Sequence, residues 1–165
     1  MATLLVIHHA PTPSLRALSD SVIAGARDDA LDDVQVRSIA ALEASAEDVV
    51  AADGVVLTTS ANFGYMSGAL KHFFDSAFLQ IGGALDDGGG AGDDAGVASP
   101  GGRLPFGLLV HGRYDTTGAV RSVLAITGAL PWRQVAPVLE VLGDVGDAER
   151  EAAYELGATV AALLT

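Results

Sequence analysis

The chain of 165 residues contains no cysteine, which excludes disulfide bonds, thiolate metal sites and thiol catalysis and favours an intracellular, cytoplasmic location. It contains a single lysine and carries a net charge of -12, so it lacks the cationic groups on which non-specific nucleic-acid binding depends. No apolar run reaches membrane-spanning length, and the N-terminus lacks the basic start of a signal peptide. These absences leave one soluble domain, residues 1–165, long enough to bury its own core.

Short apolar segments alternate with segments of helical periodicity along the chain. Apolar β-branched runs indicate strands, and apolar residues at helical spacing indicate helices with one buried face. The predicted strands are residues 4–7, 34–39, 55–57, 104–110 and 135–141, and the predicted helices begin near Ser14, Ser45 and Ser67, after Gly118 and near Asp147. The fourth helix is predicted to continue to Leu130, where Pro131 stops it.

The most informative stretch of the sequence is residues 53–75, which begins with the third strand. Residues 60–64 are small or turn-forming, which lets the backbone approach a ligand closely. Ser67 is the predicted N-cap of the helix that follows. The apolar face of that helix is predicted to comprise Leu70, Phe73, Phe74, Ala77, Phe78 and Ile81. A loop between a parallel strand and a helix is where open α/β sheets bind ligands.

The run from Phe63 to Asp75 resembles the flavin loop of flavodoxin-like NAD(P)H-dependent FMN reductases and quinone reductases. In that family Phe-Gly-Asn-Met-Ser/Ala-Gly leads into a helix that ends Phe-Phe-Asp, and here Tyr65 replaces the Asn. The resemblance implies that the loop cradles the isoalloxazine ring of FMN. It also implies that NAD(P)H reduces the flavin, that a quinone or similar acceptor reoxidises it, and that the protein forms a homodimer. The flavin would carry the chemistry, so no separate catalytic residue is expected.

Five strands alternating with five helices predict an α/β protein whose parallel sheet is covered on both faces. Right-handed crossovers make 2-1-3-4-5 the economical strand order, which is that of a three-layer flavodoxin-like fold. The second strand then lies at an edge, as its alternating apolar and polar residues require. A six-stranded dinucleotide-binding fold is the alternative, but its Gly-x-Gly-x-x-Gly turn is missing after the first strand.

Residues 82–103 interrupt this alternation with glycine and aspartate. The segment has too few apolar residues to offset the entropy of ordering it, so we predict a mobile surface loop inside the domain. Either a lid over the site or an inert insertion fits this composition.

In the predicted topology the loops after the first, third and fourth strands meet at one edge of the sheet. Three of the four histidines lie in these loops together with several hydroxyl groups, and such pooling of polar groups suits a ligand site. The candidate cofactor-binding residues are His9, Thr12, Ser14 and Arg16 in the first loop, Thr59, Ser60, Ala61, Asn62, Phe63 and Gly64 in the second, and His111, Gly112, Arg113 and Tyr114 in the third. Arg16, Arg103 and Arg113 are the candidates for contacting the 2′-phosphate of NADPH, and the sequence leaves the choice between NADH and NADPH open. We predict no metal site, because His8 and His9 lack a third ligand at a recognisable spacing.

The first loop departs from the Ser/Thr-x-Thr-Gly-x-Thr pattern with which flavodoxins hold the FMN phosphate. Thr12 keeps one hydroxyl, Pro13 stands at the glycine, and Pro11 and Pro13 both lack an N–H donor. Ser14 and Arg16 offer partial compensation, so FMN is expected to bind weakly. A flavodoxin-like binding or interaction protein that has lost flavin is therefore the alternative to an oxidoreductase, and a one-electron carrier flavodoxin is a third option.

Overall fold

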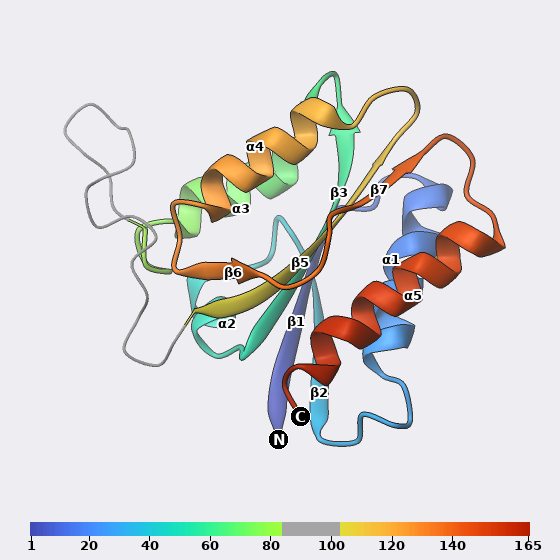
Figure 1. The fold of residues 1–165 in the computed structure, drawn as a ribbon. Helices are drawn as coiled ribbons and strands as arrows, with labels where there is room; N and C mark the ends of the chain where they lie inside the picture. The colour runs from blue at the N-terminus through green and yellow to red at the C-terminus, as the bar shows by residue number, and fades with distance from the viewer. Residues whose placement is uncertain (84–102) are drawn as a thin grey trace.

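The described residues, 1–83 and 103–165 of a computed structural model, form a seven-stranded sheet between two layers of helices (Figure 1). The strands are β1 (Ala2–His8), β2 (Val34–Ala40), β3 (Gly54–Asn62), β4 (Tyr65–Met66), β5 (Leu104–Gly112), β6 (Trp132–Gln134) and β7 (Leu139–Leu142), and the helices are α1 (Pro13–Ala26), α2 (Ala46–Val50), α3 (Gly68–Ala77), α4 (Thr117–Thr127) and α5 (Asp147–Ala162). The predicted mobile loop lies outside the described residues, apart from its two ends.

The main sheet has the order β2-β1-β3-β5-β6, with β7 also paired to β5, and all of these pairings are parallel. Strand β1 lies between β2 and β3, and its Leu4, Leu5, Val6 and Ile7 side chains are completely buried. An apolar run without polar alternation is what a strand covered on both faces requires. The predicted flavodoxin-like fold and strand order are therefore confirmed.

The helices divide between the two faces of the sheet (Figure 1). One core contains the buried side chains of α2, α3 and α4, including Phe73 and Phe74, whose ring centroids lie 5.3 Å apart. The other core contains those of α1 and α5. Gly25 and Gly157 allow α1 and α5 to approach closely, because a Cβ at Gly25 would lie 1.9 Å from the carbonyl oxygen of Tyr154. The buried stripe predicted for the third helix is confirmed at Leu70, Phe73, Phe74 and Ala77.

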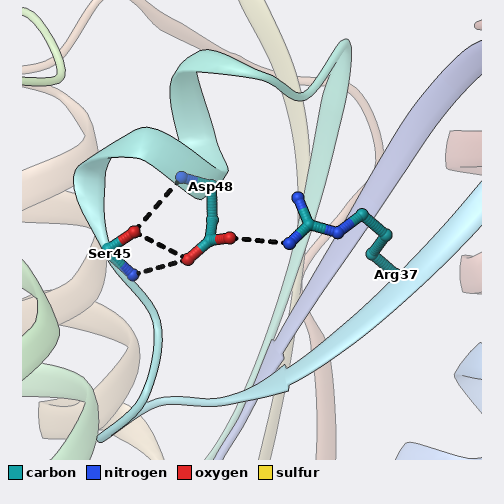
Figure 2. Close-up of polar contacts among 3 residues, drawn as sticks. All are labelled: Arg37, Ser45 and Asp48. Carbon is teal, nitrogen blue, oxygen red and sulfur yellow. Dashed lines mark hydrogen bonds and ion pairs between the residues drawn. The ribbon is translucent and has the colours of Figure 1, made fainter.

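Helix α2 begins with a capping box that Figure 2 shows in detail. The Ser45 hydroxyl accepts from the Asp48 backbone N–H, and the Asp48 carboxylate accepts from the Ser45 N–H at 2.9 Å and from Arg37 of β2 at 2.7 Å. Burial acts to raise the pKa of Asp48, but the hydrogen bonds from Ser45 and Arg37 outweigh it and the pKa lies below its ordinary value. This cap ties a five-residue helix to the neighbouring edge strand.

Two predicted elements differ from the observed ones at the end of the sheet. The predicted fifth strand, residues 135–141, overlaps only β7, and a separate strand, β6, lies just before it; both strands pair with β5. Pro137 lies between them and has no N–H to donate to a ladder, so one continuous strand was the wrong expectation. Helix α4 ends at Thr127 and not at Leu130, because Gly128 forms the C-cap before Pro131 is reached.

Candidate functional site

Three strand ends meet at the carboxyl edge of the sheet, as the topology predicted. His8 of β1 lies opposite Thr58 of β3, and Ser60 of β3 lies opposite His111 of β5. The backbone N–H of His9 donates to the Thr58 carbonyl at 3.1 Å, so the first loop leaves β1 directly beside β3. The edge therefore carries candidate residues of all three loops on adjacent strands.

Strand β3 continues to Asn62, and this corrects the expectation that residues 58–64 form an irregular loop. The Thr59 hydroxyl is buried and accepts from the Ser67 N–H at 3.1 Å, while Ser67 caps α3 by accepting from the Leu70 N–H. The predicted N-cap is thus confirmed. Thr59 joins β3 to α3, and this structural role already occupies its hydroxyl.

Ser60 differs from Thr59 because its hydroxyl has no partner. Its side chain is 9% exposed, and its Oγ is the buried side-chain oxygen without a hydrogen bond in the described part of the chain. A buried hydroxyl without a partner costs free energy, so Ser60 Oγ is available to a polar group that approaches this edge of the sheet.

Phe63 and Gly64 form the two-residue turn of a hairpin between β3 and β4. Asn62 pairs with Tyr65, and the φ angles of Phe63 and Gly64 are 49° and 80°. Two positive φ values are typical of a type I′ turn, whose first position favours asparagine, aspartate or glycine. Phe63 is fully exposed, with a relative accessibility of 109%. The turn therefore holds a large apolar ring in solvent, in a backbone conformation that such residues seldom adopt.

The loop after β5 presents a second aromatic ring at the same edge. Tyr114 is 89% exposed, whereas Gly112 is packed so closely that an added Cβ would lie 3.1 Å from the Ala61 Cβ. His111 Nε2 donates to the Gly143 carbonyl at 2.8 Å, because a carbonyl oxygen can only accept. Arg113 pairs with Asp144 at 2.7 Å, and this hydrogen bond raises the pKa of the guanidinium. His111 and Arg113 thus bind the loop after β7, while the Tyr114 ring is exposed beside Arg113.

The first loop leads into α1 through a cap of its own. Thr12 Oγ1 accepts from the Leu15 N–H at 3.2 Å, and the Thr12 carbonyl accepts the first helical bond from Arg16. The Arg16 guanidinium donates to the Pro11 carbonyl at 3.3 Å, so its charge lies over the loop. Pro13 has no N–H, and the Leu15 N–H bonds to the Thr12 side chain. The Ser14 N–H is therefore the backbone donor in the first turn of α1 that has no acceptor within the helix.

His8 precedes this loop and is half-buried. Burial lowers the pKa of His8, aided by His9 and opposed by Asp20 and Glu43, and the pKa lies below its ordinary value. The imidazole is therefore neutral at pH 7, so it adds no positive charge to the site.

Sequence reasoning placed one residue wrongly and missed three others. Arg103 precedes β5 and donates to the Trp132 carbonyl at 2.9 Å, so it lies at the amino edge, opposite the site. Tyr65, 43% exposed, lies beside the aromatic turn, and its place in the resembling motif was the available signal. Gly118 and Ser122 of α4 contact the hairpin from a distant segment, and no local pattern marks them.

In residues 1–83 and 103–165 no helix is long and apolar enough to cross a membrane. A cavity of about 520 Å³ opens at the amino edge, between α2 and the start of β5, and is lined by Val49, Asp53, Arg103, Leu104 and Trp132 among others.

Comparison with known proteins supports the same fold. A flavodoxin of Aquifex aeolicus is 32% identical over 129 residues, which cover 72% of this chain and 69% of that protein. An archaeal flavodoxin structure superposes with a TM-score of 0.76 at 12% identity, covering 98% of both chains. Flavodoxin 1 of Bacillus cereus gives a TM-score of 0.73 at 13% identity, covering 99% of this chain and 100% of the other. No family model matches the sequence. The identity and coverage of the Aquifex relative show that the chain belongs to the flavodoxin family.

Proposed function

We propose that this protein binds FMN at the carboxyl edge of the sheet and transfers electrons through it. The observation that carries the proposal is the exposed ring of Phe63 at φ 49°. Backbone strain of this kind costs on the order of 1–3 kcal/mol and persists at ligand sites, where it presents a side chain to the ligand. Membership of the flavodoxin family supports FMN as that ligand.

The residues at the edge fit the ring of a flavin. Phe63 and Tyr114 are exposed aromatic side chains from two loops at one edge, which suits contact with the apolar faces of a planar ring. Ser60 Oγ has no partner in the described chain and is suited to a polar atom of the flavin. Tyr65 adds apolar surface next to the turn. Bound FMN would supply the electron transfer, while these side chains bind and orient it.

The phosphate fits less well at the amino end of α1. The donors available there are the Ser14 N–H and hydroxyl, the Thr12 hydroxyl and the Arg16 guanidinium. An anion at a helix N-terminus is favoured by the helix dipole. Each missing N–H costs roughly 0.5–1.5 kcal/mol, or more with a charged acceptor, so two prolines weaken binding by about tenfold or more. FMN is therefore held weakly and is readily lost on purification.

A titration with FMN and with riboflavin at fixed salt tests both parts of the proposal. Quenching of flavin fluorescence should report binding of both, with only a modest preference for FMN. Failure of both flavins to bind would contradict the proposal and favour an interaction protein that has lost flavin. A preference for FMN of several thousandfold would leave the function standing and contradict our interpretation of the prolines.

Reduction by NAD(P)H is a second candidate function, favoured by the run from Phe63 to Gly68. This run has the order of the reductase flavin loop, and the hairpin leads directly into the Ser67 cap of α3. In that case the flavin-loaded protein oxidises NADH or NADPH in the presence of a quinone. Consumption of NAD(P)H at 340 nm distinguishes this function from that of a carrier, which takes electrons from a partner protein. Sedimentation of the loaded protein tests the homodimer that the reductase resemblance implies.

A further inference from the structure

The hairpin that carries Phe63 is attached to α4 through a hydroxyl. The Met66 backbone N–H of β4 donates to Ser122 Oγ at 3.3 Å, and Ser122 Oγ donates to the Ala119 carbonyl within α4 at 2.9 Å. The hydroxyl thus uses both its donor and its acceptor capacity to join the strand after the turn to the helix. Helix α4 is remote from the hairpin in sequence but fixes one side of it.

A second contact fixes the turn itself. A Cβ added at Gly118 would lie 1.9 Å from the Gly64 carbonyl oxygen and 2.8 Å from its carbon. Real Cβ atoms do not approach so closely, so any other residue at 118 would force the two segments apart by about 1 Å or more. Gly68, at the start of α3 on the other side of the hairpin, has no atom of the described residues within 4 Å of an added Cβ. Of the two helices α3 and α4, only α4 therefore makes this close contact with the turn.

If a larger residue replaced Gly118, the turn would move and helix α4 would stay in place. The Thr116 hydroxyl donates to Glu140 of β7 at 2.5 Å, and Thr116 is buried at the start of α4. Ala119, one residue after Gly118, is fully buried in the core. Phe63 and Gly64, by contrast, are exposed and have no packed side chain to hold them.

We propose that Gly118 and Ser122 are positioning residues, which fix the Gly64 peptide and thereby the height of the Phe63 ring above the flavin. This inference rests on the proposed flavin site. Gly118 acts by permitting the close approach of the Gly64 carbonyl, and Ser122 acts by accepting the Met66 N–H. Helix α4 thus sets the affinity for the flavin ring without touching it.

The first experiment uses the flavin-free protein, so it stands whether or not flavin binds. Hydrogen exchange resolved to the Met66 amide should be faster in Ser122→Ala, and Ser122→Thr, which keeps the acceptor, should restore much of the protection. Gly118→Ala should change the amide chemical shifts of residues 62–64, while Gly68→Ala should leave those of residues 62–64 nearly unchanged. Equal changes in the two glycine variants, or an unaltered Met66 amide in Ser122→Ala, would overturn the inference.

The second experiment measures the function of the contact. Gly118→Ala should weaken FMN and riboflavin by the same factor, between about tenfold and a hundredfold, because the ring site moves by about 1 Å and the phosphate site does not. The midpoint potential of the bound flavin should also shift in Gly118→Ala, which a general loss of stability would not cause. Unchanged affinity and potential in a folded Gly118→Ala variant would overturn the inference, whereas an unaltered protein that binds no flavin would contradict the proposed function.

Discussion

The turn after β3 and the loop after β1 are both proposed to hold flavin, but they are built in opposite ways. The loop after β1 is held by its own neighbours, because Thr12 caps α1 and Arg16 bonds to Pro11. The turn after β3 is held from far along the chain, through Gly118 and Ser122 of α4. A substitution in the locally held loop should therefore alter only the phosphate subsite. The turn is docked on a distant helix, so binding of the flavin ring should also depend on how that helix packs. Flavin affinities should therefore separate the two regions.

The largest effect is expected from Gly64→Val. Gly64 has φ 80° with open space around its Cα, so the penalty is conformational and of the order of 1–3 kcal/mol. Because the exposed turn can change its conformation, we expect FMN and riboflavin affinity to fall together by tenfold or more. Fluorescence titration measures this loss, and chemical denaturation measures the smaller loss of stability.

The matched control is Gly143→Val in the loop after β7. Gly143 has φ 76° and equally open surroundings, so it should lose a similar free energy of unfolding with a smaller loss of affinity. If both variants lowered flavin affinity equally, the hairpin would have no special role.

Phe63→Asn should separate binding from stability. Asparagine tolerates positive φ, so the free energy of unfolding should rise by up to about 1 kcal/mol relative to the unaltered protein. Loss of aromatic stacking should weaken both flavins by about 1–3 kcal/mol, by analogy with base stacking on aromatic side chains. Thermal unfolding and flavin titration measure the two changes. A destabilised variant with normal affinity would show that the ring is held for packing.

Ser14→Ala should affect the other region alone. It removes a hydroxyl from the proposed phosphate site and leaves the backbone N–H in place. FMN should therefore bind several-fold more weakly, because one lost hydrogen bond costs about 0.5–1.5 kcal/mol of binding free energy. Riboflavin, which has no phosphate, should bind unchanged, and the ratio of the two affinities gives the result. Equal weakening of both flavins would place Ser14 near the ring instead.

The smallest effect concerns the pH dependence of stability and His8, which precedes the loop proposed to hold the phosphate. The lowered pKa means that the unfolded chain takes up a proton more readily than the folded one. The contribution of His8 to stability is therefore complete above its ordinary pKa, near 6.5, and is lost as the pH falls through and below that value. His8→Gln should lose less free energy of unfolding between pH 7 and pH 5 than the unaltered protein. An identical loss in the two proteins would show that His8 titrates normally.

Local patterns were sufficient for much of the fold. The apolar run from Leu4 to Ile7, the capping residues Ser45 and Ser67 and the buried stripe of α3 act over a few residues, so spacing alone identified them. The alternation of strands and helices then limited the topology to very few arrangements, and the predicted order is the observed one.

The sequence by itself determined the alternating elements, their buried faces and the edge of the sheet at which the proposed site lies. Tertiary structure alone decided that Thr59 and Ser60 belong to the strand, because β3 is flanked by β1 and β5 and its ladder continues past the apolar run. It also placed Arg103 at the far edge and brought Gly118 against Gly64. These outcomes depend on contacts between segments that are distant in sequence, and such contacts leave no periodic signal because their geometry is set only when the sheet and helices pack.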